Sequence, residues 1–261
     1  MGDVTAFSPD VREEVLGRLT RAGCVAADEE TDELLAAAPS RDTLQTWTAR
    51  REHGEPLAWI VGQTRFLGHV VHVAPGVYVP RAQSGELARR AAEHLPAGGR
   101  AADLCTGSGA IAVHIAATNP AAAVVATDRD RTAVSCARRN GVHAVVADMD
   151  RGLCSGAFDL VCAVTPYVPT GGMDLLPPDV TRYEPLGALD GGDDGLDIVR
   201  QLAAGAARIL RPGGWLLTEI GGDQDLLVAP ILTARGFGQL TFWRDEDGDL
   251  RGVEARLDRS F

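Results

Sequence analysis

Short apolar segments alternate with helical segments over most of the chain, and this alternation restricts its fold more than any other feature. The strand-like segments lie at residues 100–104, 124–127, 144–147, 158–164 and 215–220, with two more near 239–243 and 252–257. The helix-like segments lie at residues 84–95, 110–117, 132–140 and 196–210. Such alternation is typical of a parallel sheet covered by helices on both faces. We therefore predict an α/β fold with a mostly parallel, doubly wound, Rossmann-like sheet.

The first 80 residues have a different pattern. Apolar residues recur at three- and four-residue steps over 9–49, which predicts helices, and Ser8-Pro9 and Ser40 are suitable helix starts. Short β-rich runs follow at 59–61, 65–67 and 70–73. We predict a helical domain over 1–50, a β-hairpin linker over 51–80 and a sheet domain over 81–261.

The composition restricts the partners and the compartment. The net charge is −11, and arginines are interleaved with acids, whereas nucleic-acid binding usually needs a basic patch. No apolar run approaches the roughly 18–20 residues that span a bilayer, and residues 1–6 do not resemble a secretion signal. The five cysteines are dispersed without metal spacing. We expect a cytoplasmic protein that binds no nucleic acid, membrane or metal.

A glycine-rich turn follows the first strand of the predicted sheet, at Asp103-Leu104-Cys105-Thr106-Gly107-Ser108-Gly109. Gly107 and Gly109 allow a ligand to approach the backbone closely. Asp128 ends the next strand, where a carboxylate can accept hydrogen bonds from ribose hydroxyls, and Asp148 ends the third, where it can meet an adenine amine. Because the full GxGxxG pattern is missing, the turn favours a nucleoside cofactor without a pyrophosphate.

Stretches along nearly the whole chain resemble the HemK/PrmC group of class I methyltransferases. They are residues 54–62, 66–68, 79–81, 103–109, 137–140, 183–185, 188–196, 210–214 and 219–221. The resemblance implies an enzyme that uses S-adenosylmethionine and methylates a glutamine side-chain amide in a release factor. It implies cofactor contacts from Cys105 to Gly109 and from Asp128, Asp148 and Met149. We also expect Asp103 and Arg81 at the cofactor site. The resemblance assigns the N-terminal helices a role in recognising the protein substrate.

The chain departs from the family at the substrate site. The family has Asn-Pro-Pro-Tyr after the fourth strand, and this chain has Val164-Thr165-Pro166-Tyr167. In the family, the Asn oxygen and the next carbonyl orient the acceptor amide, but a valine side chain accepts no hydrogen bond. We expect Thr165 and Tyr167 to line the acceptor pocket together with Val164 and Pro166.

Three hypotheses about the acceptor follow. The first is an N-methyltransferase for a planar nitrogen, such as the guanidine of arginine or of a related small cationic metabolite. Glu184, Asp179 and Asp190 are carboxylates compatible with that substrate, although the turn around Glu184 also has a structural explanation. The second is a protein glutamine methyltransferase in which Thr165 replaces the lost Asn. The third is an inactive protein that binds the cofactor or a partner. Residues 50–80 are a possible homodimer contact.

Overall fold

The computed structural model describes residues 7–258, and the side chains of Pro178 and Asp179 lie outside the described part. The predicted helical domain starts at residue 1, so its first six residues are outside that part as well. Three helices begin the described chain: α1 (Pro9–Arg21), α2 (Ala27–Ala37) and α3 (Arg41–Glu52). They pack around an apolar cluster of their own, which includes Leu19, Leu34 and Leu44. The Ser40 side chain accepts a hydrogen bond from Thr43 N at 3.1 Å, as expected of a helix cap.

One prediction for the segment between these helices and the large sheet is wrong. Trp59-Ile60-Val61 was expected to be a strand but belongs to a short helix, α4 (Leu57–Val61), which ends at Gly62 in a left-handed conformation. A short apolar run has the same appearance in a buried helix and in a strand. The two following runs do form an antiparallel hairpin of β1 (Gln63–Phe66) and β2 (His69–His72).

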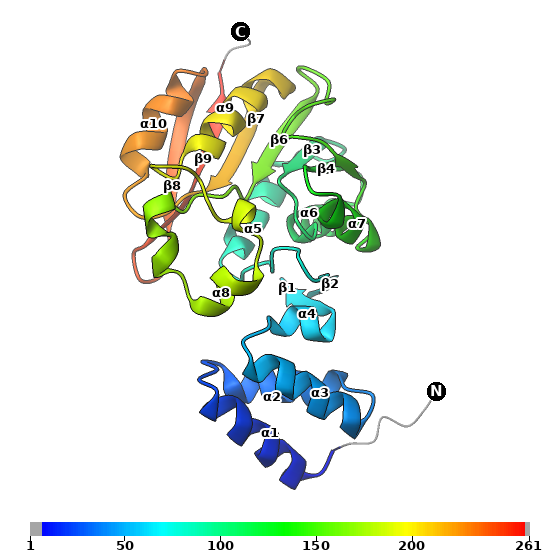
Figure 1. Cartoon of the computed structure of the whole chain (residues 1–261). Helices are drawn as coiled ribbons and strands as arrows, with labels where there is room; N and C mark the ends of the chain where they lie inside the picture. Colours follow the sequence, from blue (N-terminus) through cyan, green and yellow to red (C-terminus); the bar gives the residue numbers. More distant parts are fainter. Residues whose placement is uncertain (1–6, 259–261) are drawn as a thin grey trace.

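The large sheet confirms the predicted fold class (Figure 1). Its order is β5-β4-β3-β6-β7-β9-β8, and β9 runs antiparallel to both of its neighbours. The other pairs are parallel. The strands are β3 (Arg100–Leu104), β4 (Ala123–Asp128), β5 (Ala144–Val146), β6 (Phe158–Ala163), β7 (Leu210–Glu219), β8 (Phe237–Arg244) and β9 (Leu250–Leu257).

Helices cover both faces of this sheet. Ala101 and Leu160 pack with α5 (Ser84–His94) and α6 (Ala110–Thr118), whereas their chain neighbours Ala102 and Val161 pack with α9 (Asp197–Ile209). Successive strand residues point to opposite faces, so the two apolar clusters lie on opposite sides. The helix α7 (Arg131–Arg139) packs beside α6, and α10 (Asp225–Thr233) packs in the cluster of α9.

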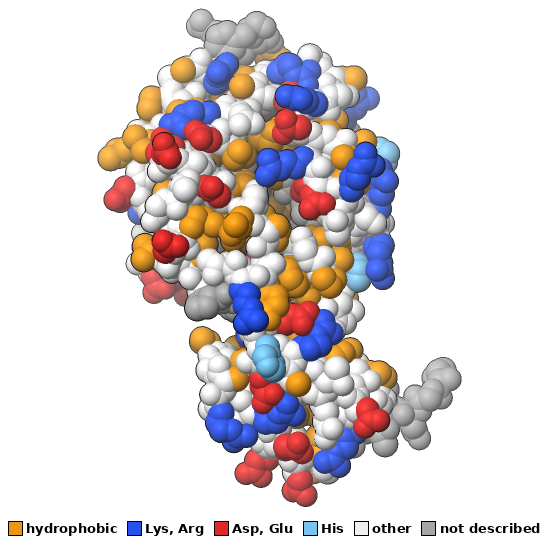
Figure 2. All heavy atoms as spheres, in the orientation of Figure 1, with side chains coloured by type: hydrophobic (Ala, Val, Ile, Leu, Met, Phe, Trp, Pro, Cys, Tyr) orange, Lys and Arg blue, Asp and Glu red, His pale blue; other side chains and the backbone are white. Residues whose placement is uncertain are grey.

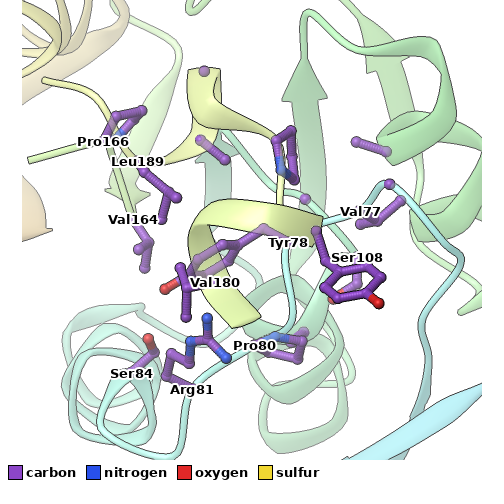
Figure 3. A pocket seen from close by; sticks show the side chains of 18 of the residues that line it. Val77, Tyr78, Pro80, Arg81, Ser84, Ser108, Val164, Pro166, Val180 and Leu189 are labelled. Carbon is purple, nitrogen blue, oxygen red and sulfur yellow. The ribbon is translucent and has the colours of Figure 1, made fainter. Parts of the chain in front are cut away.

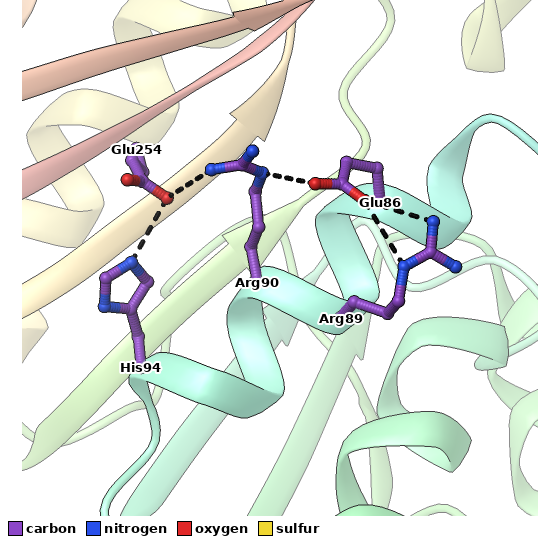
Figure 4. Close-up of polar contacts among 5 residues, drawn as sticks. All are labelled: Glu86, Arg89, Arg90, His94 and Glu254. Atoms are coloured by element: carbon purple, nitrogen blue, oxygen red, sulfur yellow. Dashed lines mark hydrogen bonds and ion pairs between the residues drawn. The ribbon is translucent and has the colours of Figure 1, made fainter. Parts of the chain in front are cut away.

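The helix α5 is connected to the far end of the sheet by a polar network (Figure 4). Glu254 of β9 accepts from Arg90 at 3.4 Å and contacts His94 Nε2 at 3.1 Å, while Arg90 Nε also donates to Glu86 at 2.7 Å. The His94 ring stacks on Trp215 with centroids 4.0 Å apart. These contacts fix the direction of α5, whose first residue, Ser84, lies at the candidate site.

The connection from β6 to α9 has little regular structure. It contains a 3-10 turn at Thr170–Leu175, the short helix α8 (Pro178–Tyr183) and a second 3-10 turn at Leu186–Ala188. Val168 N donates to Leu189 O, and Gly191 N donates to Val168 O, so the connection folds back on its own start. This long segment covers the carboxyl ends of the central strands.

Candidate active site

The glycine-rich turn leaves β3 with three residues in left-handed conformations. Cys105 has φ 56°, Gly107 has φ 55° and Gly109 has φ 83°. A Cβ on Gly109 would lie 3.0 Å from side-chain atoms of Ala137 and Val142, so this position packs tightly against α7 and its end. A Cβ on Gly107 would meet open space. The turn therefore presents bare backbone to a ligand.

Asp128 is oriented by this turn. Its carboxylate accepts hydrogen bonds from Gly107 N and from Asp130 N, both at 2.9 Å. Burial raises the pKa of Asp128, although the two backbone donors act in the opposite direction. The carboxylate keeps unused lone pairs on both oxygens, because each oxygen accepts one of these bonds.

Asp148 and Met149 form the next corner of the site. Met149 is buried with φ 55°, and its carbonyl accepts from Thr127 Oγ1 at 2.8 Å. Its sulfur lies 3.5 Å from Cys105 Sγ, and burial raises the pKa of the Cys105 thiol to about 12. The Asp148 side chain is half-exposed, with Arg151 at 3.5 Å. The corner combines an apolar surface with an exposed carboxylate.

Asp103 lies beneath the turn. Thr106 Oγ1 donates to its carboxyl group at 2.6 Å, and the residue is 1% exposed. Because burial disfavours the charged form, it raises the pKa of Asp103 to about 7. The Asp103–Thr106 pair supports the turn from below.

These elements border a large cleft of about 1260 Å³. The cleft is lined by the predicted site residues except Gly109 and Glu184. It is also lined by the N-terminal part of the chain, at the loop 22–26 between α1 and α2 and at residues 51–54 around the end of α3. Figure 2 shows apolar side chains gathered near the junction between the N-terminal helices and the sheet. Val25, at this junction, is fully exposed. The cleft thus extends from the glycine-rich turn to the N-terminal helices.

The segment 164–167, which we call the acceptor wall because the sequence predicts that it lines the acceptor pocket, borders the cleft beside the glycine-rich turn. Leu104 of β3 pairs with Ala163 of β6, so Cys105 and Val164 leave neighbouring strands at the same level. Thr165 is 1% exposed, and its hydroxyl has no hydrogen-bond partner among the described residues. Val164 is half-buried against the apolar cluster of α5 and α6. Burial raises the pKa of Tyr167, whose hydroxyl accepts from Gln83 Nε2 at 3.3 Å.

Arg81 lies beside the acceptor wall in Figure 3, near Val180 and Ser84. Its guanidinium forms an ion pair with the buried Glu184 and lies 5.0 Å from the centroid of the Tyr78 ring. The structure brings Arg81 and Glu184 together, although the sequence assigned them to the cofactor and the acceptor, respectively. The contact of Arg81 with the cofactor stays a prediction.

Sequence reasoning missed several lining residues. Tyr78, Val180 and Leu189 surround the acceptor wall, with the Tyr78 side chain extending towards Val180 in Figure 3. Burial raises the pKa of the Tyr78 hydroxyl. An aromatic residue directly before the quoted Val79-Pro80-Arg81 stretch was a usable signal for Tyr78. The loop 22–26 gave no such signal.

Neither a metal-binding cluster nor a membrane-spanning helix is found among the described residues. No group of three or more His, Cys, Asp or Glu side chains is arranged to hold a metal ion. No helix in the same part of the chain is long and apolar enough to cross a membrane.

Comparisons with known proteins agree with this geometry. A methyltransferase small domain family matches residues 71–167. A release factor glutamine methyltransferase from Geobacter sulfurreducens is 33% identical, over 92% of this chain and 93% of its own. A 4-amino-L-phenylalanine/4-methylamino-L-phenylalanine methyltransferase from Streptomyces pristinaespiralis is 34% identical, over 89% and 90%.

A solved structure shows the same fold. It is a T. thermophilus 16S rRNA N2 G1207 methyltransferase in complex with AdoMet and guanosine, with a TM-score of 0.52 and 20% identity. The match covers 76% of this chain and 45% of that one. The family expected from the sequence is confirmed by the curated relatives, which match almost end to end. The chain belongs to the HemK/PrmC family of class I methyltransferases and is an S-adenosylmethionine-dependent methyltransferase.

Proposed function

We propose that this enzyme methylates a neutral planar nitrogen, and that the acceptor is a glutamine side-chain amide of a protein such as a release factor. The observation that carries the proposal is the Thr165 hydroxyl, which is buried in the cleft wall without a partner among the described residues. A buried hydroxyl without a hydrogen bond is costly, and a substrate N–H would satisfy it.

The residues around the glycine-rich turn suit S-adenosylmethionine. Asp128 has lone pairs for ribose hydroxyls, and Met149 with Cys105 offers an apolar surface to a flat base. Gly107 exposes its backbone to open space, so the remaining part of the cofactor can approach it. When bound, S-adenosylmethionine supplies a methyl group on a positively charged sulfur.

The acceptor wall would act by orientation. Thr165 Oγ1 accepts one amide N–H and the Thr165 carbonyl accepts the other, which directs the nitrogen towards the cofactor side of the cleft. Tyr167 packs against the planar amide. Methyl transfer would form the N–C bond, break the bond between the methyl group and sulfur and release S-adenosylhomocysteine, while the acceptor nitrogen loses one proton to solvent. Because an amide nitrogen is a poor nucleophile, holding it in line accounts for much of the rate.

A guanidinium acceptor has weaker support, because two of the three carboxylates suggested for it are already engaged, and the side chain of the third, Asp179, lies outside the described part of the chain. Glu184 pairs with Arg81, and Asp190 accepts from Thr170 Oγ1 and Gly192 N. At the far end of the cleft, Glu30 pairs with Arg51 at 2.6 Å. A buried cation needs a free carboxylate partner, so a neutral nitrogen suits this wall better.

The size of the cleft favours a protein over a metabolite. It is lined both by the glycine-rich turn and by the loop 22–26 between α1 and α2, so a large acceptor can contact both parts. The Geobacter relative is named for a release factor. An aromatic amine is the second candidate, because Val164 makes the wall more apolar and the Streptomyces relative is named for 4-amino-L-phenylalanine.

The test is a parallel transfer assay with labelled S-adenosylmethionine. The acceptors are an intact release factor, a short glutamine peptide from it, 4-amino-L-phenylalanine and free arginine. We expect label in the release factor, on a glutamine located by mass spectrometry. Label only in the aromatic amine would establish the second candidate, and label only in arginine the guanidine hypothesis. Tight binding of S-adenosylhomocysteine with no transfer to any acceptor would favour the inactive protein.

A further inference from the structure

Gly191 and Gly195 lie against the main chain of the acceptor wall. A Cβ on Gly191 would lie 2.8 Å from Pro166 O, and a Cβ on Gly195 would lie 2.3 Å from Tyr167 O. Gly195 also has φ 74°, so both space and backbone conformation favour glycine there. The loop 190–196 therefore contacts the main chain of Pro166 and Tyr167 directly.

One side chain connects this loop, the acceptor wall and the end of β7. Gln224 is 7% exposed and lies just before α10, outside the lining of the cleft. Its Nε2 donates to Tyr167 O at 3.0 Å and to Asp194 O at 3.3 Å. Its Oε1 accepts from Gly221 N at 2.9 Å. Each polar atom of the amide is thus used in joining backbone segments.

The ring of Tyr167 is held by the same segment. A Cβ on Gly221 would lie 3.4 Å from Tyr167 Cε2, so the ring packs closely over Gly221. Gln224 thus holds Tyr167 O while binding the residue beneath the ring. The carbonyl of Tyr167 therefore contacts Gln224 and the ring contacts a residue bonded to Gln224, a side chain that does not line the cleft.

We infer that Gln224 is a positioning residue for methyl transfer, acting through the main chain of Tyr167. The inference rests on the proposed acceptor wall at 164–167. The side chain needs two donors and an acceptor in one plane, which an amide supplies and a carboxylate does not. A glutamate at this position would face two carbonyl oxygens with no proton to donate.

The first experiment needs no acceptor. Hydrogen–deuterium exchange is measured by mass spectrometry on the whole protein with S-adenosylhomocysteine, for Gln224→Glu, Gln224→Ala and wild type. We expect faster exchange in 165–168 and 190–196 in both variants, because Val168 N and Gly191 N make the bonds that join these loops. The cofactor turn at 105–109 should keep its protection. Unchanged exchange in both loops would overturn the inference, whatever the acceptor proves to be.

The second experiment uses the acceptor labelled best by wild type. Gln224→Glu should lower kcat about tenfold or more at pH 8, with S-adenosylhomocysteine affinity unchanged. At lower pH the carboxyl group that this substitution introduces becomes protonated and donates one hydrogen bond again, so the activity of the variant relative to wild type should rise. The control is Asp225→Ala, which removes a 3.2 Å ion pair with Arg244 and a 3.0 Å hydrogen bond from Leu226 N, both outside the two loops.

These outcomes distinguish the role of Gln224 from the proposed function. A flat activity ratio across pH, with kcat like that of wild type, would contradict the role of Gln224 while leaving the acceptor wall in place. No transfer by wild type, combined with faster exchange in the variants, would count against the proposed function and not against the role of Gln224.

Discussion

At the scale of single residues, the proposed contact with the acceptor falls to Thr165, because Val164 stands where the family has an asparagine. Thr165 keeps a hydroxyl with no partner among the described residues, in a place where burial is nearly complete. Such a group destabilises the protein unless a ligand satisfies it. If Thr165 binds the acceptor as proposed, removing its hydroxyl should stabilise the protein and slow methyl transfer, and the two effects can be measured separately.

Replacing Thr165 tests this opposition. Thr165→Val keeps the shape and removes the hydroxyl, so we expect methyl transfer to fall roughly tenfold, the loss of about one hydrogen bond. The same change should raise the melting temperature, since removal of an unsatisfied buried hydroxyl stabilises by about 1 kcal/mol. Thr165→Ser is the matched control and should keep most of the activity. A variant that lost stability and kept activity would show that the hydroxyl has a structural role.

Glu219 gives the molecule a pH-dependent stability. Burial raises the pKa of Glu219 from its ordinary 4.5 to about 7, and one of its oxygens has no hydrogen-bond partner among the described residues. Between these pH values the folded protein holds a proton that the unfolded chain has released. The free energy of unfolding must therefore fall as pH rises through this window, by at most about 1.4 kcal/mol per pH unit for one proton.

We expect Glu219→Gln to flatten this slope. Chemical denaturation between pH 4.5 and 7.5 measures it, because the amide does not titrate. Part of the slope should persist, since burial also raises the pKa of Asp103 to about 7. A slope identical to that of wild type would show that Glu219 is ionised in the folded protein across the whole range.

At the scale of elements, Asn140 connects the hairpin of β1 and β2 to the glycine-rich turn. Its side-chain oxygen accepts from His72 N at 2.7 Å, and its nitrogen donates to His72 O and Ser108 O, both at 2.8 Å. The residue follows α7, which packs beside α6, so one amide joins β2, α7 and the glycine-rich turn. The sequence suggested a helix end at this position and a family resemblance over 137–140, but it did not predict these contacts.

Asn140→Ala should therefore have two effects. The free energy of unfolding should fall by roughly 1–3 kcal/mol, and S-adenosylhomocysteine should bind roughly fivefold more weakly, because Ser108 loses its support. The control is Asn119→Ala, which removes a 3.0 Å bond to Ala92 O away from the turn. We expect calorimetry to find normal cofactor affinity in the control. Equal weakening in both variants would attribute the effect to general destabilisation.

The elements also show what sequence patterns can and cannot predict. Most strands were located to within a residue or two, because a run such as 158–163 is apolar over most of its length, but β7 begins at Leu210, five residues before its predicted start at 215. The helix α10 was missed, since Pro230 lies inside it. Asp128 and Asp148 were recognisable because strand ends meet at one edge of the sheet. Gln224 and loop 22–26 were not, since only tertiary packing brings them there.

At the scale of the whole molecule, two distant parts of the chain meet across the cleft. Tyr183 of α8 donates to His53 O at 3.0 Å, and its ring meets Trp59 edge-on with centroids 6.4 Å apart. These contacts join the segment over the acceptor wall to the end of the N-terminal helices. The position of one part therefore depends on the other.

Tyr183→Phe removes only the hydroxyl of this connection. The loss is about 1 kcal/mol, so KM for an intact protein acceptor should rise about fivefold while kcat changes little. A short glutamine peptide that does not reach the N-terminal helices should keep its KM. If both acceptors respond equally, the contact serves the acceptor wall itself and not the placement of the N-terminal helices.

The pairing of β3 with β6 has one more consequence. The glycine-rich turn and the acceptor wall begin directly after the paired residues Leu104 and Ala163. Their separation is therefore set by hydrogen bonds between adjacent strands, which lie about 4.8 Å apart. If the turn holds the methyl donor and the acceptor wall holds the acceptor, as proposed, the distance between donor and acceptor is set by the backbone. A side-chain change at 164, such as valine in place of the family's asparagine, then alters the contacts with the acceptor and leaves that distance unchanged.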